Sequence, residues 1–421
     1  MQLMQGGIAI IPTSPVRNRN RDVDFPFRPD SDFYYLTHFP EPEAVAVLVP
    51  GREHGEFILF CRDRDPEKEI WEGHRAGLEG ACRLYGADDA FPIDDMGDIM
   101  PGLLENREKV YCTMGRYPRF DQKLLDWVNE VRSKGRTGVS APGEFVDLSH
   151  ILHELRLVKR PDEIKIMKRA CRVSVAAHRR AMQACRPGMM EYELQAELEY
   201  EFRKGGGQFP AYPSIVASGA NACVLHYTEN DARLKDGDLI LIDAGAEVDC
   251  YAADVTRTFP VNGRFSPEQK SLYEVVLAAQ TAAIETVRPG NHWNEPHETA
   301  VQVLVDGLVD LGLLNGSKDK LIEERHYRRF YMHRTGHWLG MDVHDVGDYK
   351  VDDQWRVLEP GMVMTVEPGL YIAPGSEDID RRWWGIGIRV EDDVLVTRQG
   401  HEVLSDGAPK TVADIEALMA G

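Results

Sequence analysis

The chain has 421 residues, of which 43% are apolar and 28% are charged, a composition that excludes a wholly disordered or fibrous protein. At roughly 100–200 residues per domain, this length predicts two or three domains with a large buried core. The 49 basic and 69 acidic residues give a net charge of -20, which argues against nucleic acid or an anionic membrane as partner.

Neither the N-terminus nor the cysteines suggest export. The first residues lack the basic region and long apolar segment of a signal peptide. No run of ~18 apolar residues occurs, so we expect no membrane-spanning helix. The seven cysteines are dispersed and form no Cys-x-x-Cys pair, which is typical of reduced thiols rather than disulfides or a thiolate zinc site. We therefore expect a cytoplasmic protein.

The first third of the chain has the pattern of an α/β domain. Short apolar runs such as 44–49, 56–61 and 109–112 alternate with turn signals and helical stretches. The pattern changes near residue 150, where a long helix follows. We therefore divide the chain into an N-terminal domain, residues 1–151, and a second domain, residues 152–421.

The second domain begins with helices and ends with strands. Pro161 with the two acids that follow it predicts the start of a helix, and Pro187-Gly188 predicts its end. Further helices are expected over 192–204, 267–288 and 294–311, and the last third of the chain is rich in strand patterns.

Residues 239–259 predict an antiparallel hairpin with a carboxylate on each arm. If the turn centres on Val248 and Asp249, Asp243 and Asp254 lie opposite each other on one face. Two such carboxylates repel each other unless a cation lies between them. This hairpin alone fits a metal site and a pair of solvent-exposed aspartates about equally well.

Two later segments add carboxylates at strand positions. Glu367 ends the apolar run 362–367, and Pro368 stops the strand there. In segment 385–394, alternation places Arg389 and Glu391 on the same strand face. An exposed Arg/Glu pair is common, so this strand by itself is weak evidence for a site.

Three histidines, His333, His337 and His344, lie within twelve residues. The His-x-x-x-His spacing matches part of a helical zinc motif, but no Glu follows the first His, and Gly336 and Gly340 argue against a regular helix. A single histidine is usually structural, whereas this cluster together with four carboxylates favours a functional site.

Four carboxylates and one imidazole suit Mn²⁺, Co²⁺, Fe²⁺ or Zn²⁺, and five ligands suffice for two ions. Two ions ~3.5–4 Å apart can share a bridging water, lower its pKa and polarise a carbonyl. The set of residues therefore favours hydrolysis.

The order and local context of these residues resemble the pita-bread dinuclear metallopeptidases, the group of methionine aminopeptidase, prolidase and aminopeptidase P. Within that group, the strings around His226, His333, His344 and Arg389 resemble the Xaa-Pro aminopeptidases (aminopeptidase P). The N-terminal segments 24–28 and 31–43 do so as well. The resemblance implies an α/β (α+β) protein, with an N-terminal α/β domain that has a mixed sheet, followed by a pita-bread catalytic domain.

The resemblance also implies roles for individual residues. Asp243 would chelate one metal ion, Asp254 and Glu391 would bridge both ions, and His337 and Glu367 would complete the second site. Glu367 would also hold the proton of a hydroxide that bridges the two ions.

Further roles concern the substrate. His226, His333 and His344 would grip the scissile carbonyl and the proline, and Arg389 would order the site. Trp71 resembles a tryptophan that reaches the active site of a neighbouring subunit, so a homodimer or homotetramer is implied.

The implied activity is metal-dependent release of an N-terminal residue from peptides with proline at the second position, with Mn²⁺ as the expected ion. A prolidase, which cuts only Xaa-Pro dipeptides, is the main alternative. A non-catalytic pita-bread binding module is a third hypothesis, disfavoured because all five ligands and the three accessory histidines are present. Methionine aminopeptidase fits less well, since it normally lacks a preceding domain of this size.

Overall fold

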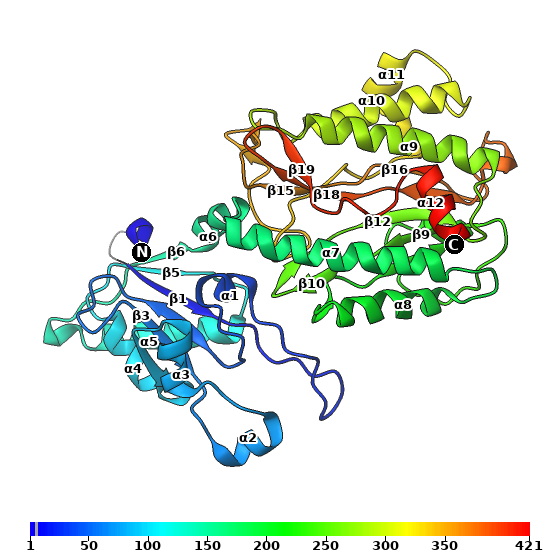
Figure 1. Ribbon diagram of the computed structural model, residues 1–421. Helices are drawn as coiled ribbons and strands as arrows, with labels where there is room; N and C mark the ends of the chain where they lie inside the picture. Colours follow the sequence, from blue (N-terminus) through cyan, green and yellow to red (C-terminus); the bar gives the residue numbers. More distant parts are fainter. Residues whose placement is uncertain (5–6) are drawn as a thin grey trace. The chain divides into compact units, whose positions relative to one another are not determined.

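The computed structural model describes residues 1–4 and 7–421, and the chain divides into two units, Met1–His153 and Glu154–Gly421 (Figure 1). Among the described residues, no helix combines the length and apolar character needed to cross a membrane. All seven cysteines are free thiols.

The first unit is built on a six-stranded sheet with the strand order β4-β3-β2-β1-β5-β6. The β1–β2 and β2–β3 pairs are antiparallel, whereas the β3–β4, β1–β5 and β5–β6 pairs are parallel, so the sheet is mixed as expected. The strands are β1 (Ile8–Pro12), β2 (Val45–Leu48), β3 (Phe57–Cys61), β4 (Asp89–Pro92), β5 (Lys109–Cys112) and β6 (Glu144–Asp147).

Both faces of this sheet are covered by helices. Side chains alternate along a strand, so Ile8 and Ile10 of β1 join a core with α4 and α5, whereas Ala9 and Ile11 join a core with α1, α3 and α6. The helices of this unit are α1 (Ser31–Thr37), α2 (Pro66–Glu72), α3 (Gly77–Tyr85), α4 (Met96–Leu104), α5 (Pro118–Ser133) and α6 (Ser149–Leu157), the last of which continues into the second unit.

The second unit contains the helices that the sequence predicted. Helix α7 begins at Pro161 and ends at Ala184, shortly before Pro187-Gly188, as expected. The helices are α7 (Pro161–Ala184), α8 (Glu191–Lys204), α9 (Pro267–Thr286), α10 (Glu295–Asp310), α11 (Lys318–Glu323) and α12 (Val412–Ala420).

Short antiparallel sheets form the middle of the second unit. Figure 1 shows β9, β12, β15 and β18 between the α7–α8 pair and the α9–α10 pair, and one large apolar core joins these elements. The longer strands are β8 (Ile215–Ser218), β9 (Leu239–Asp243), β12 (Thr256–Pro260), β15 (Val363–Val366), β16 (Gly369–Ile372), β17 (Ile386–Arg389) and β18 (Asp392–Val396). The shorter ones are β7 (Phe209–Pro210), β10 (Ala246–Val248), β11 (Tyr251–Ala252), β13 (Lys350–Val351), β14 (Gln354–Trp355) and β19 (His401–Val403).

The hairpin of residues 239–259 exists, but its predicted register is wrong by two residues. Asp249 and Cys250 form the turn, both with positive φ (49° and 64°), and Asp243 lies opposite Thr256 rather than Asp254. A two-residue hairpin turn of this kind needs positive φ at both central positions, which places the turn one residue later. Because a shift of two residues keeps the side-chain parity, both aspartates still point to the same face.

The segment 385–394 is also divided where a single strand was expected. β17 pairs with β16 up to Arg389, and β18 pairs with β15 from Asp392 onward. Val390 and Glu391 lie between these two strands, where the chain changes partner. Glu391 therefore lies at a junction of two sheets rather than on a strand beside Arg389.

Candidate metal centre

A cavity of about 440 Å³ in the second unit gathers most of the residues that the sequence singled out. Its lining includes Asp243, Asp254, His337, Glu367, Glu391, His226, His333, His344 and Arg389. Trp71 is placed elsewhere, in α2 of the first unit, with 88% of its surface exposed.

The carboxylates of the cavity lie at strand ends. Asp243 is the last residue of β9, Asp254 and Glu391 lie shortly before β12 and β18, and Glu367 directly follows β15. His337 comes from an extended irregular segment, which agrees with the rejection of a helical zinc motif. Because each of these residues lies at or near the end of a strand, the sheet fixes its backbone while its carboxylate lines the cavity.

Two glycines permit this convergence because the backbones approach each other closely. A Cβ on Gly245 would lie 1.7 Å from the carbonyl oxygen of Ala253, and a Cβ on Gly336 would lie 2.0 Å from that of Thr365. Any side chain would force these strands apart. Gly245 thus keeps the two arms of the hairpin together, and Gly336 seats His337 against β15.

The ligand-type atoms cluster tightly. Asp254, His337 and Glu391 each offer an atom within 4.8 Å of the others. His337 Nε2 lies 3.3 Å from Asp254 Oδ2 and 3.6 Å from Glu367 Oε1. Arg389 donates to Asp243 Oδ2 at 2.5 Å and so orients the fifth candidate ligand.

The electrostatics of this cluster fit a cation. Burial, and then the neighbouring carboxylates, raise the pKa of Glu391 well above its usual range, and burial raises that of Glu367 to about 7. Burial alone would lower the pKa of His337, but its hydrogen bond to Asp254 and the charge of Glu367 raise it to about 9. The raised pKa values mean that this cluster binds protons strongly, and divalent ions held by the same oxygen and imidazole donors would displace those protons.

Two residues that the sequence did not point to, Tyr212 and Thr256, contact the candidate ligands. The hydroxyl of Tyr212 lies 2.7 Å from Asp243 Oδ1 and 2.5 Å from Asp254 Oδ1. Thr256 donates to Glu391 Oε2 at 2.6 Å and accepts from Arg389 Nε at 3.2 Å. A single tyrosine or threonine is not part of a recognisable sequence motif, so these contacts could be identified only from the structure.

One accessory histidine, His333, is held in a defined tautomer. The Nδ1–H of His333 donates to the carbonyl of Arg334 at 2.7 Å, so its Nε2 accepts from the hydroxyl of Tyr371 at 2.9 Å. Burial, and then the charge of Arg389, lower the pKa of His333 to about 3, which keeps the ring neutral. With both ring nitrogens engaged, the neutral ring lines the cavity without repelling cations.

The loop that carries His344 is fixed by buried charges. Asp345, the next residue, accepts from Arg156 at 2.6 Å and from Lys159 at 2.9 Å, and all three side chains are buried. The ring of His344 packs edge to face on that of His337, with 4.4 Å between centroids. His344 is therefore held against a candidate metal ligand.

This fold and cavity are those of a metallopeptidase. The model of metallopeptidase family M24 matches residues 165–398, and that of the aminopeptidase P N-terminal domain matches residues 1–111. The chain belongs to metallopeptidase family M24, whose enzymes are hydrolases that depend on divalent metal ions.

Individual relatives are similar over nearly their whole length. The chain is 44% identical to an Xaa-Pro aminopeptidase of Escherichia coli, over 99% of this chain and 95% of that protein. The structure of Pseudomonas aeruginosa aminopeptidase PepP is 63% identical, with a TM-score of 0.98, covering 99% of this chain and 94% of that one. Proline aminopeptidase P II from Yersinia pestis is 47% identical with a TM-score of 0.96, covering 99% and 95%.

Proposed function

We propose that this protein is an Xaa-Pro aminopeptidase, which releases the N-terminal residue from peptides that have proline at the second position. The observation that carries this proposal is the single cavity in which five metal-type ligands meet three histidines and a buried arginine. The similarity to Xaa-Pro aminopeptidases over nearly the full chain supports the substrate class.

The five ligands divide between two divalent ions, for which we propose Mn²⁺. Asp243 would hold one ion, His337 and Glu367 would hold the other, and Asp254 and Glu391 would be shared. When bound, such ions lower the pKa of a water molecule and polarise the scissile carbonyl. Arg389 and Tyr212 keep the oxygen atoms of Asp243 and Asp254 directed into the cavity.

The residues of this chain then handle the proton and the substrate. Glu367, which lines the cavity beside the other candidate ligands, is placed to take a proton from the attacking water and deliver it to the leaving nitrogen. His226 and His344 hydrogen-bond the carbonyl oxygen as it gains negative charge, and the neutral ring of His333, whose N–H is donated to Arg334, contacts the proline side of the substrate. The bond before proline is a tertiary amide with no N–H, so the site needs no acceptor there. The cavity also has apolar walls that suit a pyrrolidine ring, namely Pro213, Ile215, Leu225 and Val343.

The deciding experiment measures initial rates on metal-stripped protein before and after Mn²⁺ is added. Matched Xaa-Pro-Yaa and Xaa-Ala-Yaa peptides and Xaa-Pro dipeptides serve as substrates. We expect no cleavage without metal, and after reloading we expect release of the N-terminal residue chiefly from the longer proline peptides. Cleavage confined to dipeptides would identify a prolidase, and absence of metal-dependent cleavage would favour a binding module.

We also propose a cytoplasmic homodimer or homotetramer in which Trp71 completes the active site of a neighbouring subunit. Trp71 and Ile70, both on α2, have 88% and 81% of their surface exposed, which is unusual for large apolar side chains. Burying them in a subunit interface would remove this apolar area from water.

Light scattering tests this interface. We expect the wild-type protein to have the mass of a dimer or tetramer, and Trp71→Ala to weaken the assembly or to raise KM. Substitution of Leu84 with Ala is a control, since this residue is also exposed in the same unit but lies on α3. A monomeric wild-type protein with full activity would contradict the proposal.

A further inference from the structure

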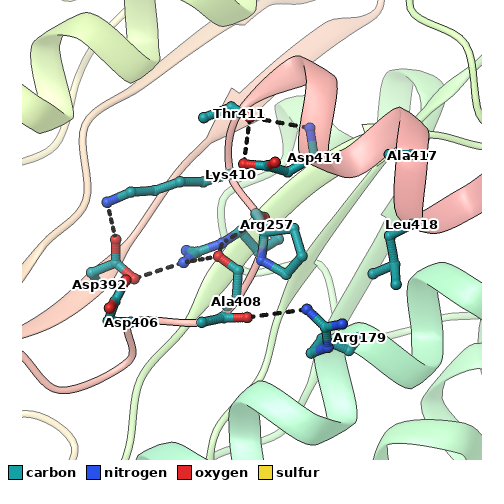
Figure 2. A pocket seen from close by; sticks show the side chains of 12 residues that line it. Arg179, Arg257, Asp392, Asp406, Ala408, Lys410, Thr411, Asp414, Ala417 and Leu418 are labelled. Carbon is teal, nitrogen blue, oxygen red and sulfur yellow. Dashed lines mark hydrogen bonds and ion pairs between the residues drawn. The ribbon is translucent and has the colours of Figure 1, made fainter.

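A second cavity, of about 520 Å³, lies beside the C-terminal segment of the second unit (Figure 2). Helix α12 and residues 406–411 form one side of it, and Arg179 of α7 forms another. Its lining mixes acids and bases, and Thr411 caps the start of α12 by accepting from the backbone N–H of Asp414. Because Asp392, Asp406 and Asp414 balance Arg179, Arg257 and Lys410 in number, the cavity does not have the character of an anion site.

A network of buried charges runs along the edge of this cavity. Lys410 donates to Asp392 Oδ2 at 2.7 Å, and Arg257 donates to Asp392 Oδ1 at 2.7 Å (Figure 2). Gln280 and Ser405 donate to the same carboxylate, each at 2.7 Å. Asp392 and Arg257 are fully buried, so the hydrogen bonds from these partners must compensate each charge for its lost hydration.

Arg257 connects this network to the candidate metal centre through the main chain. Its Nη1 donates to the backbone carbonyl of Glu391 at 2.5 Å and to that of Thr256 at 2.9 Å. Thr256 in turn donates through its hydroxyl to Glu391 Oε2 at 2.6 Å. Glu391 is thus held at two points: its backbone carbonyl accepts from Arg257, and its carboxylate accepts from Thr256.

The place of Glu391 in the fold makes this support necessary. Glu391 lies between β17 and β18, where the chain changes from one sheet to another. Its backbone N–H donates to the carbonyl of Thr256, but its carbonyl bonds to the guanidinium of Arg257 rather than to a strand. Without the guanidinium, the backbone carbonyl of Glu391 would lose this hydrogen-bond partner.

We propose that Lys410 is a positioning residue for the metal centre, acting through Asp392 and Arg257 to fix the main chain of Glu391. The same C-terminal segment also holds Arg257 directly, since the backbone carbonyls of Ala408 and Pro409 accept from its guanidinium at 3.1 Å each. The inference rests on the proposed metal-binding role of Glu391.

Loss of the ammonium group leaves one Asp392 oxygen with Gln280 as its remaining protein donor. The Asp392–Arg257 pair would then loosen, and Glu391 would be less well placed to bind metal. Residues that hydrogen-bond directly to metal ligands typically contribute about 10–100-fold in metal affinity or activity, and Lys410 acts through two intermediates, so we expect an effect at the lower end of this range.

The test is calorimetric titration of Mn²⁺ into metal-stripped Lys410→Met, Lys410→Arg and wild-type protein, with thermal melting of each. We expect Lys410→Met to bind Mn²⁺ about tenfold more weakly and Lys410→Arg to restore most of the affinity. Arg264→Ala is the matched control, because it breaks the exposed ion pair with Glu416 that also anchors α12. We expect this control to leave Mn²⁺ affinity unchanged.

Chemical rescue separates positioning from general destabilisation. Side chains smaller than lysine leave room beside the existing cavity, so methylammonium chloride is expected to restore Mn²⁺ affinity to Lys410→Ala, whereas sodium chloride of equal ionic strength is not. If Lys410→Met melts at a lower temperature but binds Mn²⁺ as tightly as wild type, the proposal is wrong. If the wild-type protein itself binds no Mn²⁺, the proposed metal centre fails instead.

Discussion

Replacement of Glu367 with Ala is expected to reduce turnover of an Xaa-Pro-Yaa peptide by about 10³-fold or more. The variant lacks both a metal ligand and the group proposed to carry the proton, and general acid–base catalysis alone contributes ~10²–10⁴-fold. Steady-state rates at saturating Mn²⁺ measure this effect. Near-normal turnover would remove Glu367 from the mechanism.

The same substitution should not damage the fold. Burial raises the pKa of Glu367 from 4.5 to about 7, so ionisation of this carboxyl opposes folding in the metal-free protein. For an acid whose pKa is raised, this destabilisation develops as the pH rises from about 4.5 to 7 and is complete above it. Metal-free Glu367→Ala is therefore expected to melt at the same temperature as the metal-free wild type or higher, at pH 8.

His344→Ala provides a contrast to Glu367→Ala. His344 lines the cavity but lies outside the set of five candidate ligands, so its loss should reduce turnover while the variant retains its bound metal. Elemental analysis distinguishes the two variants. Substantial loss of metal from His344→Ala would show that this histidine acts on the metal rather than on the substrate.

Replacement of Gly245 with Ala is expected to lower the melting temperature by an amount on the order of 5–10 °C and to reduce metal binding. The new Cβ would lie 1.7 Å from the carbonyl oxygen of Ala253, which is backbone and cannot rotate away. Forcing an extra carbon into such a contact typically costs about 1–3 kcal/mol, and more where the backbone must move. Such a loss corresponds to several degrees in a domain of this size.

The metal effect follows from the position of Gly245 between Asp243 and Asp254. Separating the two arms of the hairpin would separate these carboxylates and weaken the shared hydrogen bonds of Tyr212. Gly143→Ala is the control, because a Cβ there meets no atom within 4 Å and its φ needs no glycine. Equal melting temperatures for the two variants would show that the hairpin tolerates the added carbon.

Much of the architecture follows from local patterns in the sequence. The proline and acids at 161–163, with the helical spacing after them, suffice to predict α7, because a helix start depends on a few neighbouring residues. The short apolar runs of the first domain become β2, β3 and β5 for the same reason. Carboxylates that end apolar runs, such as Asp243 and Glu367, were also recognisable, since charge at the end of a buried strand is unusual.

The sequence by itself determined most of the helices and strands and singled out acids and histidines that line one cavity, because helix starts, apolar runs and charged strand ends depend on residue types close together in the chain. Only the tertiary structure decided the register of the hairpin, which depends on the positive φ angles of Asp249 and Cys250. It also placed Tyr212, Thr256 and Arg257 around the carboxylates, through contacts between residues that are as many as 135 positions apart. Such contacts depend on the packing of strands from distant parts of the chain, which no local pattern encodes.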